Sequence, residues 1–355
     1  MPRSKIAGIG MYVPNSVVTN NDLKKYMDTS DEWIQERTGV KERRYADRTE
    51  ETTTTMGVEA AKIAIERAGL SPQDIDFIVF ATICPDYYFP GCGVLLQRAM
   101  QMKNIGALDV RNQCSGFIYA ISVADQFIKS GMYKNILVVG AEKHSFGLDF
   151  STRGRNISVI FGDGAGAVVL QPTDASTGSA ADHGLLSTHL HSDGNNAEIL
   201  AMFNPGTHAN HWVKDHKLAD FNDAEMGDMF MSHAMIDKAQ NFPTMDGPAV
   251  FKFAVEKFPE VILESLKANN LQTSDLRLLI PHQANLRISQ FVQRKLRLRD
   301  DQVYNNIQKY GNTTAASIPI ALCEAWEEGK IKDGDLICLA AFGSGFTWAS
   351  ALLRW

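Results

Sequence analysis

The sequence lacks the features that mark three common classes of protein. Its five cysteines are odd in number and form no C-x-x-C pair, and no secretory leader is present, so we expect a reducing, cytoplasmic location without a disulfide framework. Lys and Arg number 35 against 41 Asp and Glu, and the resulting net charge of −6 provides no basic surface of the kind that nucleic acids require. No apolar run approaches the roughly 20 residues of a membrane span. We therefore expect neither nucleic acid nor membrane as a partner.

Metal-binding motifs are also absent. The region between residues 187 and 250 is rich in histidine, but it has no H-E-x-x-H spacing and no accompanying cysteine, so we expect no metal site. The histidines concerned are His189, His191, His208, His211, His216 and His233.

Cys114 stands where a predicted strand meets a predicted helix. An apolar run at residues 107–110 gives way to small and polar residues around Cys114, and an amphipathic pattern then continues to about Ser130. The free N–H groups of a first helical turn favour thiolate over thiol and can bind an oxyanion, so the position suits a nucleophile. A buried core thiol is the alternative, because free cysteine is among the most buried residue types.

The second half of the chain repeats the first. At an offset of 201 positions, segment 69–78 matches segment 270–279, and each follows a long predicted helix and leads into a buried strand. At an offset of 198, a later pair of matching segments places Cys114 over Asn312, which also precedes a helix. We therefore predict an α/β protein with two pseudo-symmetric β/α halves, residues 1–172 and 173–355. The second half contains a cap-like insertion at about 203–245.

His282 follows the buried strand of the second half, so it emerges at the carboxyl end of that sheet, in the cleft between the halves. The candidate catalytic trio is then Cys114, His282 and Asn312. In a cysteine protease the histidine would take a proton and the asparagine would orient it. If both residues instead aim N–H donors at one point, they form an oxyanion hole that stabilises an enolate. That arrangement suits condensation of a Cys-bound acyl group with a decarboxylating thioester.

At these residues the chain resembles the β-ketoacyl-[acyl carrier protein] synthase III family, the condensing enzymes that initiate type II fatty acid synthesis. The resemblance runs essentially from end to end. Its motifs are D-E-W-I-x-x-R-T-G at 31–39, C-S-G-F at 114–117, F-G-D-G-A-G at 161–166, P-H-Q-A-N at 281–285, G-N-T at 311–313 and F-G-S-G-F-T-W at 342–348.

The resemblance implies a thiolase-like fold, a five-layer αβαβα sandwich, and a homodimer. It implies an acyltransferase that joins an acyl-CoA primer to malonyl-[acyl carrier protein], with no cofactor apart from coenzyme A as part of the substrate. Cys114 would carry the acyl group, while His282 and Asn312 hold the malonyl thioester carbonyl. The backbone N–H groups of Cys114 and Ser344 would form the oxyanion hole for the acyl carbonyl.

The same resemblance implies binding residues outside the trio. Trp33, Arg37, Arg155 and Asn285 would contact coenzyme A, and Phe89 would reach across the dimer into the partner's acyl pocket. A basic surface for the acidic carrier protein would consist of Lys252, Arg287, Arg294 and Lys295.

Two departures from the family pattern concern the primer. The region from about 203 to 245 is longer than the family norm, and Pro248 stands where Asn is common. We therefore expect a longer or branched acyl-CoA rather than acetyl-CoA. A related thiolase-fold acyltransferase or condensing enzyme of a specialised pathway, using longer acyl-CoA substrates, is the alternative within the fold. A cysteine hydrolase and a catalytically silent carrier-binding protein are the alternatives from other classes.

Overall fold

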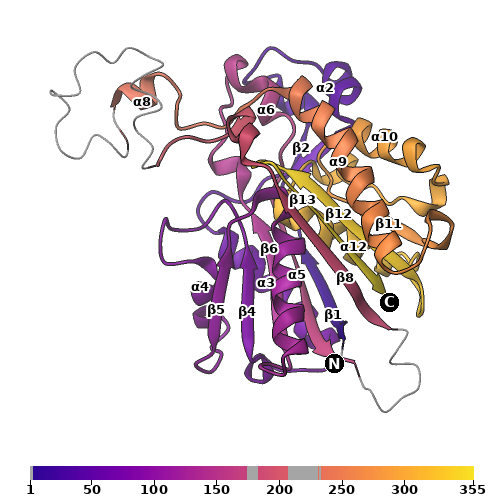
Figure 1. Ribbon diagram of the computed structural model, residues 1–355. Helices are drawn as coiled ribbons and strands as arrows, with labels where there is room; N and C mark the ends of the chain where they lie inside the picture. The colour runs from indigo at the N-terminus through magenta and orange to yellow at the C-terminus, as the bar shows by residue number, and fades with distance from the viewer. Residues whose placement is uncertain (1–2, 174–182, 207–230, 232) are drawn as a thin grey trace.

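Two β-sheets organise the chain in the computed structural model, which describes residues 3–173, 183–206, 231 and 233–355 (Figure 1). The first sheet has the strand order β1 (Ser4–Tyr12), β7 (Gly164–Pro172), β6 (Ile136–Glu142), β4 (Phe77–Ala81) and β5 (Gly106–Val110). The second has the order β11 (Leu278–Pro281), β12 (Leu336–Gly343), β13 (Thr347–Arg354) and β8 (Gly184–Ser192). The strands at the centre of both sheets are continuous apolar runs, as expected for sheets covered on both faces.

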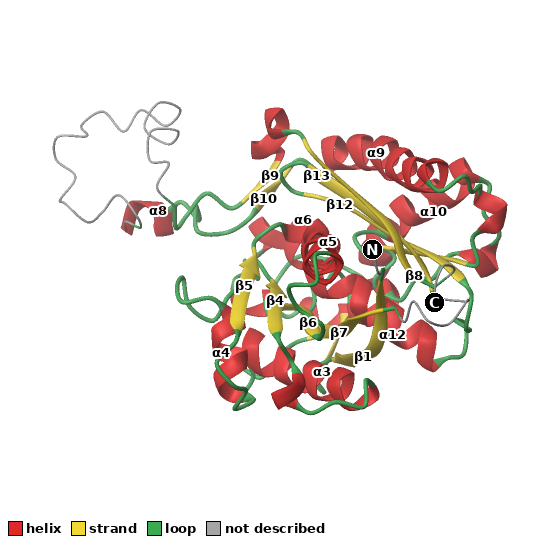
Figure 2. Ribbon diagram, turned by 60° about the horizontal axis from the view of Figure 1, so that its bottom comes forward, coloured by secondary structure: helices red, strands yellow, loops and turns green. Residues whose placement is uncertain are grey.

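Helices cover both faces of each sheet (Figure 2). Between the sheets lie α5 (Gly116–Lys129) and α12 (Ser317–Glu327), whose apolar side chains form a core shared with both sheets. Outside the first sheet are α3 (Thr53–Arg67) and α4 (Cys92–Ala99), and outside the second are α9 (Gly247–Ala268) and α10 (Leu286–Leu296). The result is the predicted five-layer αβαβα sandwich. The thiolase-like fold expected from the sequence is confirmed.

Shorter elements connect these layers. They are β2 (Val17–Thr19), α1 (Asn20–Leu23), α2 (Asp31–Thr38), β3 (Glu42–Arg44), α6 (Arg155–Ser158), β9 (Leu200–Ala201), α8 (His233–Asp237), β10 (Thr244–Met245) and α11 (Ile307–Tyr310). Two 3-10 turns, η2 (Gln113–Ser115) and η9 (Thr314–Ala316), come directly before the two central helices. Within the described residues, no helix is both long enough and apolar enough to cross a membrane.

The internal repeat is real, but its register near the nucleophile differs from the prediction. The turns η2 and η9, and the helices α5 and α12 that follow them, begin 201 positions apart. Strands β4 and β11 keep the same offset. The counterpart of Cys114 is therefore Ala315, and Asn312 lies just before the matching turn. The offset of 198 was wrong here because it came from the segments after the central helices, and α12 has 11 residues where α5 has 14.

Most of the predicted cap-like insertion lies outside the described residues, which leave out 207–230 and 232. Its described parts are α8 and the short ribbon in which β9 pairs with β10. In Figure 1, α8 projects to the side of the molecule on which α4 and β5 lie. Pro248, one of the two departures from the family pattern, occupies the first turn of α9, where proline is well tolerated.

Candidate active site

Cys114 lies in the tight turn that the sequence predicts between a strand and a helix. The residue before it, Gln113, has a positive φ of 44°, and α5 starts two residues after it. The thiol is buried, with 8% of the residue exposed. Close approach of Gly343, the last residue of β12, closes this pocket: a Cβ at Gly343 would lie 2.8 Å from Cys114 Sγ. Only glycine therefore fits opposite the nucleophile.

The surroundings of Cys114 favour the thiol over the thiolate that its position before a helix suggests. Burial, and secondarily the charge of Glu142, raise the pKa of Cys114 to about 12. The backbone N–H groups of Ser344 and of Cys114 itself act in the opposite direction but are outweighed. These are the two N–H groups expected to form the oxyanion hole. Local helix geometry could not reveal the burial or the carboxylate, since both come from other parts of the chain.

His282 follows β11 and is buried, as the sequence predicts. Its Nδ1 lies 2.6 Å from Ser317 Oγ, which also accepts the backbone N–H of Gln283. The Ser317 hydroxyl can donate to Nδ1, and the ring then carries its proton on Nε2. Burial, and then the neighbouring His144, lower the pKa of His282 to about 3, so the ring is neutral. Its Nε2 is buried and has no partner among the described residues, which leaves an N–H donor for a substrate.

Asn312 is held by hydrogen bonds through both its backbone and its side chain. Its N–H donates to the Ile160 carbonyl at 2.9 Å, and its carbonyl accepts the Gly162 N–H at 3.1 Å. The side-chain Oδ1 accepts the Thr314 N–H at 2.8 Å. This bond assigns the two ends of the amide and leaves Nδ2 as the donor that can face a substrate.

The structure brings the trio into one region at the carboxyl end of the central strand β12. The turn η2, which carries Cys114, contacts both η9 and β12. The backbone N–H of His282 donates to the carbonyl of Ala340 in β12. The His282 side chain contacts Ser317, the residue directly after η9. With its proton on Nε2, the neutral histidine acts as a hydrogen-bond donor and not as the general base of a cysteine protease.

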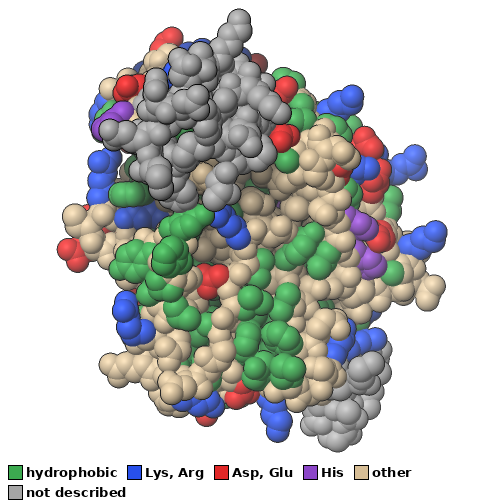
Figure 3. Space-filling view, turned by 60° about the vertical axis from the view of Figure 1, so that its left-hand side comes forward, with side chains coloured by type: hydrophobic (Ala, Val, Ile, Leu, Met, Phe, Trp, Pro, Cys, Tyr) green, Lys and Arg blue, Asp and Glu red, His purple; other side chains and the backbone are tan. Residues whose placement is uncertain are grey.

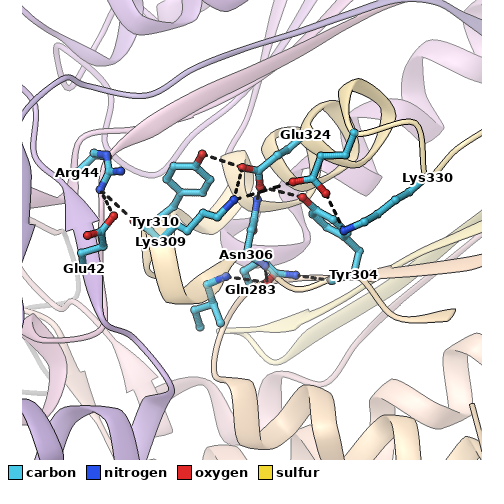
Figure 4. Close-up of polar contacts among 11 residues, drawn as sticks. Glu42, Arg44, Gln283, Tyr304, Asn306, Lys309, Tyr310, Glu324 and Lys330 are labelled. Carbon is cyan, nitrogen blue, oxygen red and sulfur yellow. Dashed lines mark hydrogen bonds and ion pairs between the residues drawn. The ribbon is translucent and has the colours of Figure 1, made fainter. Parts of the chain in front are cut away.

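Gln283, the residue after the histidine, ties the histidine strand to the segment that carries the asparagine. Its Nε2 donates to the carbonyls of Pro281 at 2.6 Å and Tyr304 at 3.3 Å. Its Oε1 accepts the N–H groups of Asn306 at 3.0 Å and Ile307 at 3.2 Å, at the start of α11. All four bonds are buried, so one amide fixes the spacing between two catalytic segments (Figure 4).

A buried carboxylate reinforces this spacing from α12. Glu324 accepts hydrogen bonds from Asn306 Nδ2, Lys309 Nζ and the hydroxyls of Tyr304 and Tyr310, at 2.9–3.0 Å, as Figure 4 shows. Two of these donors precede α11 and two lie in its last two residues, so the helix that leads into Asn312 is anchored at both ends.

Comparison with known proteins agrees with this geometry. Residues 108–194 match the family model described as 3-oxoacyl-[acyl-carrier-protein (ACP)] synthase III, and residues 266–355 match the model of its C-terminal part. The β-ketoacyl-[acyl-carrier-protein] synthase III of Aquifex aeolicus is 43% identical over 352 residues, which cover 99% of both chains. That of Helicobacter pylori is 44% identical over 351 residues, covering 99% of this chain and 97% of the relative. The chain belongs to the β-ketoacyl-[acyl-carrier-protein] synthase III family.

Solved structures give the same result. The synthase III crystal structure from Aquifex aeolicus superposes with a TM-score of 0.85 at 42% identity, covering 99% of this chain and all of the other. A priming β-ketosynthase from the R1128 polyketide pathway reaches 0.84 at 30% identity, covering 99% and 96%. Xanthomonas campestris OleA, at 16% identity and a TM-score of 0.81, shares the fold. This member of the synthase III family is accordingly a condensing acyltransferase.

The residues that the synthase III resemblance assigns to coenzyme A gather around Trp33 on α2. The guanidinium carbons of Arg37 and Arg155 lie 4.4 and 5.2 Å from the centroid of the indole ring. Asn285 donates to the Arg37 carbonyl at 2.9 Å, and its Oδ1 caps α10. Asn285 therefore holds the Arg37 segment in place, while Trp33 and the two arginines present an aromatic and cationic surface.

Phe89 lies in the loop between β4 and α4 and is 80% exposed. Other exposed apolar side chains occur in the same part of the molecule, and Figure 3 shows apolar side chains gathered on this face. They are Tyr87, Tyr88, Val94 and Leu108. Strand β5, which carries Leu108, is the edge strand of its sheet.

The four residues assigned to the carrier-protein surface are all exposed. Lys252 lies on α9, and Arg287, Arg294 and Lys295 lie on α10. These helices pack against each other through their apolar faces, so the four cations share one outer surface of the second half.

A metal-like set of side chains lies behind the catalytic trio. The candidate ligand atoms of Cys84, Glu142 and His144 lie within 4.8 Å of one another. However, the Glu142 oxygens already accept the N–H groups of Ile83 and Cys84 and the Thr82 hydroxyl, and a longer bond comes from Ala315. Both ring nitrogens of the histidine are also engaged. The polar atoms of this cluster therefore satisfy one another without an ion.

Several residues that support the site were not identified from the sequence. Gln283 belongs to the P-H-Q-A-N motif, and Ser317 lies shortly after the G-N-T motif. Their hydrogen bonds to Asn306 and His282 join segments that are distant in the sequence. Glu142 closes an otherwise apolar strand, and an isolated acid in that position is the signal that could have identified it. Nothing in the local sequence distinguishes His144 from an ordinary loop histidine.

Proposed function

We propose that this enzyme condenses an acyl-CoA primer with malonyl-[acyl carrier protein] to give a 3-oxoacyl-[acyl carrier protein], the initiating step of fatty acid synthesis. One observation carries the proposal. A buried cysteine shares its site with a neutral histidine whose Nε2 has no partner in the described part of the chain and with an asparagine whose Oδ1 is already bonded. Two N–H donors are thus available for one substrate oxygen, as an enolate requires.

In the first half-reaction, Cys114 Sγ attacks the primer thioester carbonyl. The bond from that carbonyl to the coenzyme A sulfur breaks, and the thiol proton ends on the departing thiolate. Negative charge develops on the carbonyl oxygen, and the N–H groups of Cys114 and Ser344 stabilise it. Trp33, Arg37 and Arg155 hold the nucleotide part of the substrate. Its phosphates match the two guanidinium groups and its adenine matches the indole.

In the second half-reaction, the malonyl bond to the carboxylate breaks and carbon dioxide leaves. The electron pair passes to the thioester. The resulting enolate oxygen accepts hydrogen bonds from the N–H groups of His282 Nε2 and Asn312 Nδ2. The enolate carbon then attacks the acyl carbonyl, and the Cys114 sulfur leaves and regains a proton. The high pKa of Cys114 makes the free thiol its stable form after each turnover.

Intact-protein mass spectrometry tests these roles. Wild-type enzyme mixed with acyl-CoA gains the mass of one acyl group, and Cys114→Ala gains none. His282→Ala and Asn312→Ala acquire the acyl group but consume malonyl-[acyl carrier protein] slowly. Full condensation by Cys114→Ala would overturn the assignment. Release of free acid in place of the 3-oxoacyl product would identify a hydrolase.

We also propose that the active species is a homodimer formed through the face that carries β5 and Phe89. An edge strand beside exposed aromatic side chains supports this interface, because such surfaces are otherwise liabilities for a free chain. Phe89 would then reach the partner's acyl pocket. Sedimentation of wild type and Leu108→Lys tests this, with a shift to monomer expected for the variant.

The primer itself is proposed to be longer or more branched than acetyl, from the length of the 203–245 region. A comparison of kcat/KM for acetyl-, isobutyryl- and octanoyl-CoA decides it. A clear preference for acetyl-CoA would remove this proposal and leave the condensation chemistry intact.

The carrier-protein docking surface is proposed to be the four exposed cations on α9 and α10. Reversing the charge at Arg294 should raise the KM for malonyl-[acyl carrier protein] and leave that for acyl-CoA unchanged. An equal effect on both substrates would contradict this assignment.

A further inference from the structure

A chain of hydrogen bonds runs from the site asparagine into the interior of the first half. Thr314 donates its N–H to Asn312 Oδ1 at 2.8 Å, and its hydroxyl lies 2.7 Å from His144 Nε2. On the far side of the ring, His144 Nδ1 lies 3.5 Å from Cys84 Sγ. His144 is 6% exposed and its ring packs on Phe161 at a centroid distance of 4.6 Å. The histidine thus reaches the asparagine segment from the first half of the chain, through Thr314.

The conformation of Thr314 shows why this contact matters. Its φ is 46°, in the left-handed region that β-branched residues rarely adopt. Such conformations persist only where surrounding contacts hold them, and they concentrate at functional sites. The buried bond from the Thr314 hydroxyl to His144 is one such contact. In this conformation the Thr314 N–H points at Asn312 Oδ1.

We propose that His144 and Thr314 are positioning residues that set the orientation of the Asn312 amide. His144 holds the strained threonine, the threonine N–H holds Oδ1, and Nδ2 is thereby directed to the substrate enolate. Without the anchor, the threonine relaxes, Oδ1 loses its fixed donor and the amide samples orientations that present oxygen to the enolate. The idea rests on the proposed role of Asn312 in the malonyl half-reaction.

Neutrality of the histidine is consistent with this role. Burial lowers the pKa of His144 to about 3, and burial followed by the charge of Glu142 raises the pKa of Cys84 well above its ordinary value. The contacts therefore hold between uncharged groups across the working pH range, so the positioning does not depend on pH.

Two variants and two half-reactions test the proposal. Thr314→Val keeps the branched shape and the N–H but loses the hydroxyl, and His144→Phe keeps the ring on Phe161 but loses both nitrogens. Acylation of Cys114 by acyl-CoA should remain within about twofold of wild type. Single-turnover consumption of the preformed acyl-enzyme by malonyl-[acyl carrier protein] should slow by about 10- to 100-fold, since a displacement near 1 Å has such an effect.

Matched controls separate positioning from folding. Thr314→Ser restores the hydroxyl and should recover most of the malonyl step. Thr188→Val removes a hydroxyl that lies 2.9 Å from Ser122 Oγ, away from the trio, and should leave both half-reactions unchanged. Equal slowing of acylation and malonyl consumption by Thr314→Val would overturn the proposal, and so would unchanged malonyl consumption in both variants.

A double-mutant cycle identifies the residue through which the effect passes. In an Asn312→Ala background, Thr314→Val should cause no further loss in the malonyl step, because the amide that it orients is gone. Full additivity would overturn the proposal while leaving the role of Asn312 in place. If Asn312→Ala alone consumed malonyl-[acyl carrier protein] at the wild-type rate, the proposed role of Asn312 would fall, and the positioning role with it.

Discussion

Replacement of Gly343 by alanine tests the geometry around the nucleophile most directly. The new Cβ would lie 2.8 Å from the Sγ of Cys114 and 3.3 Å from the backbone nitrogen of Cys114. It would come closest to the Cβ of Cys114. Carbon atoms in ordinary contact are about 3.5–4.0 Å apart. Either Cys114 or the end of β12 must therefore move by about 1 Å. The adjacent residue is Ser344, so both proposed oxyanion donors are attached to the displaced segments.

The expected effects follow from that displacement. Overpacking of a buried site costs about 1–3 kcal/mol, so the variant should unfold at a lower temperature but still fold. A misplacement of about 1 Å in the reacting groups slows chemistry by about 100-fold. We therefore expect acylation of Cys114 in Gly343→Ala, followed by intact-protein mass after mixing with acyl-CoA, to be about 100-fold slower than in wild type.

A control variant distinguishes this clash from a general effect of replacing glycine. A Cβ added at Gly147 would meet no atom of the described residues within 4 Å, and the φ of this glycine is negative. Gly147→Ala should therefore acylate at the wild-type rate. Wild-type acylation by a folded Gly343→Ala variant would refute the assigned contact between β12 and the nucleophile.

Three further predictions concern protonation, tautomer and substrate binding. Burial raises the pKa of Glu142 from 4.5 to about 7, so the folded state holds this proton more tightly than the unfolded chain. The stabilisation is complete below pH 4.5 and is lost as pH rises toward 7. Urea unfolding should therefore show the stability of wild type relative to Glu142→Gln falling over that range, and a constant difference would contradict it. Ser317→Ala removes the donor to His282 Nδ1 and should slow malonyl consumption about tenfold with acylation unchanged, whereas parallel slowing would argue against a tautomer role. Trp33→Ala should raise the KM for acyl-CoA about tenfold while leaving an acyl-pantetheine thioester unaffected, and an equal loss with both would exclude a nucleotide contact.

The state of the nucleophile illustrates a limit of local reasoning. Cys114 sits before a helix, and isolated helix starts favour the thiolate. In the folded chain the thiol is enclosed by Gly343 and lies in the field of Glu142, so burial and charge outweigh the nearby N–H donors. In the proposed reaction, Cys114 therefore starts as a thiol and loses its proton during attack.

The asparagine shows a second limit. Sequence matching paired Asn312 with Cys114, but the structural counterpart of Cys114 is Ala315. Helix α12 is three residues shorter than α5, so an offset measured after the helices does not apply before them. Asn312 nevertheless lies close to η9, the turn that corresponds to the turn carrying Cys114.

Local patterns in the sequence determined the helices and strands and predicted the position of Cys114, while the internal repeat predicted His282 and Asn312 as its companions. Apolar runs specify the buried strands, and capping and periodic patterns specify the helices. The strand-turn-helix pattern around Cys114 specifies where this cysteine lies. All of these depend on neighbours within a few residues. Only the tertiary structure decided the chemical state of the trio. The pKa of Cys114, the tautomer of His282 and the orientation of the Asn312 amide are set by Glu142, Ser317 and Thr314. Two of these three controls act between segments far apart in the chain, and electrostatic fields and hydrogen bonds between such segments exist only once each half has folded.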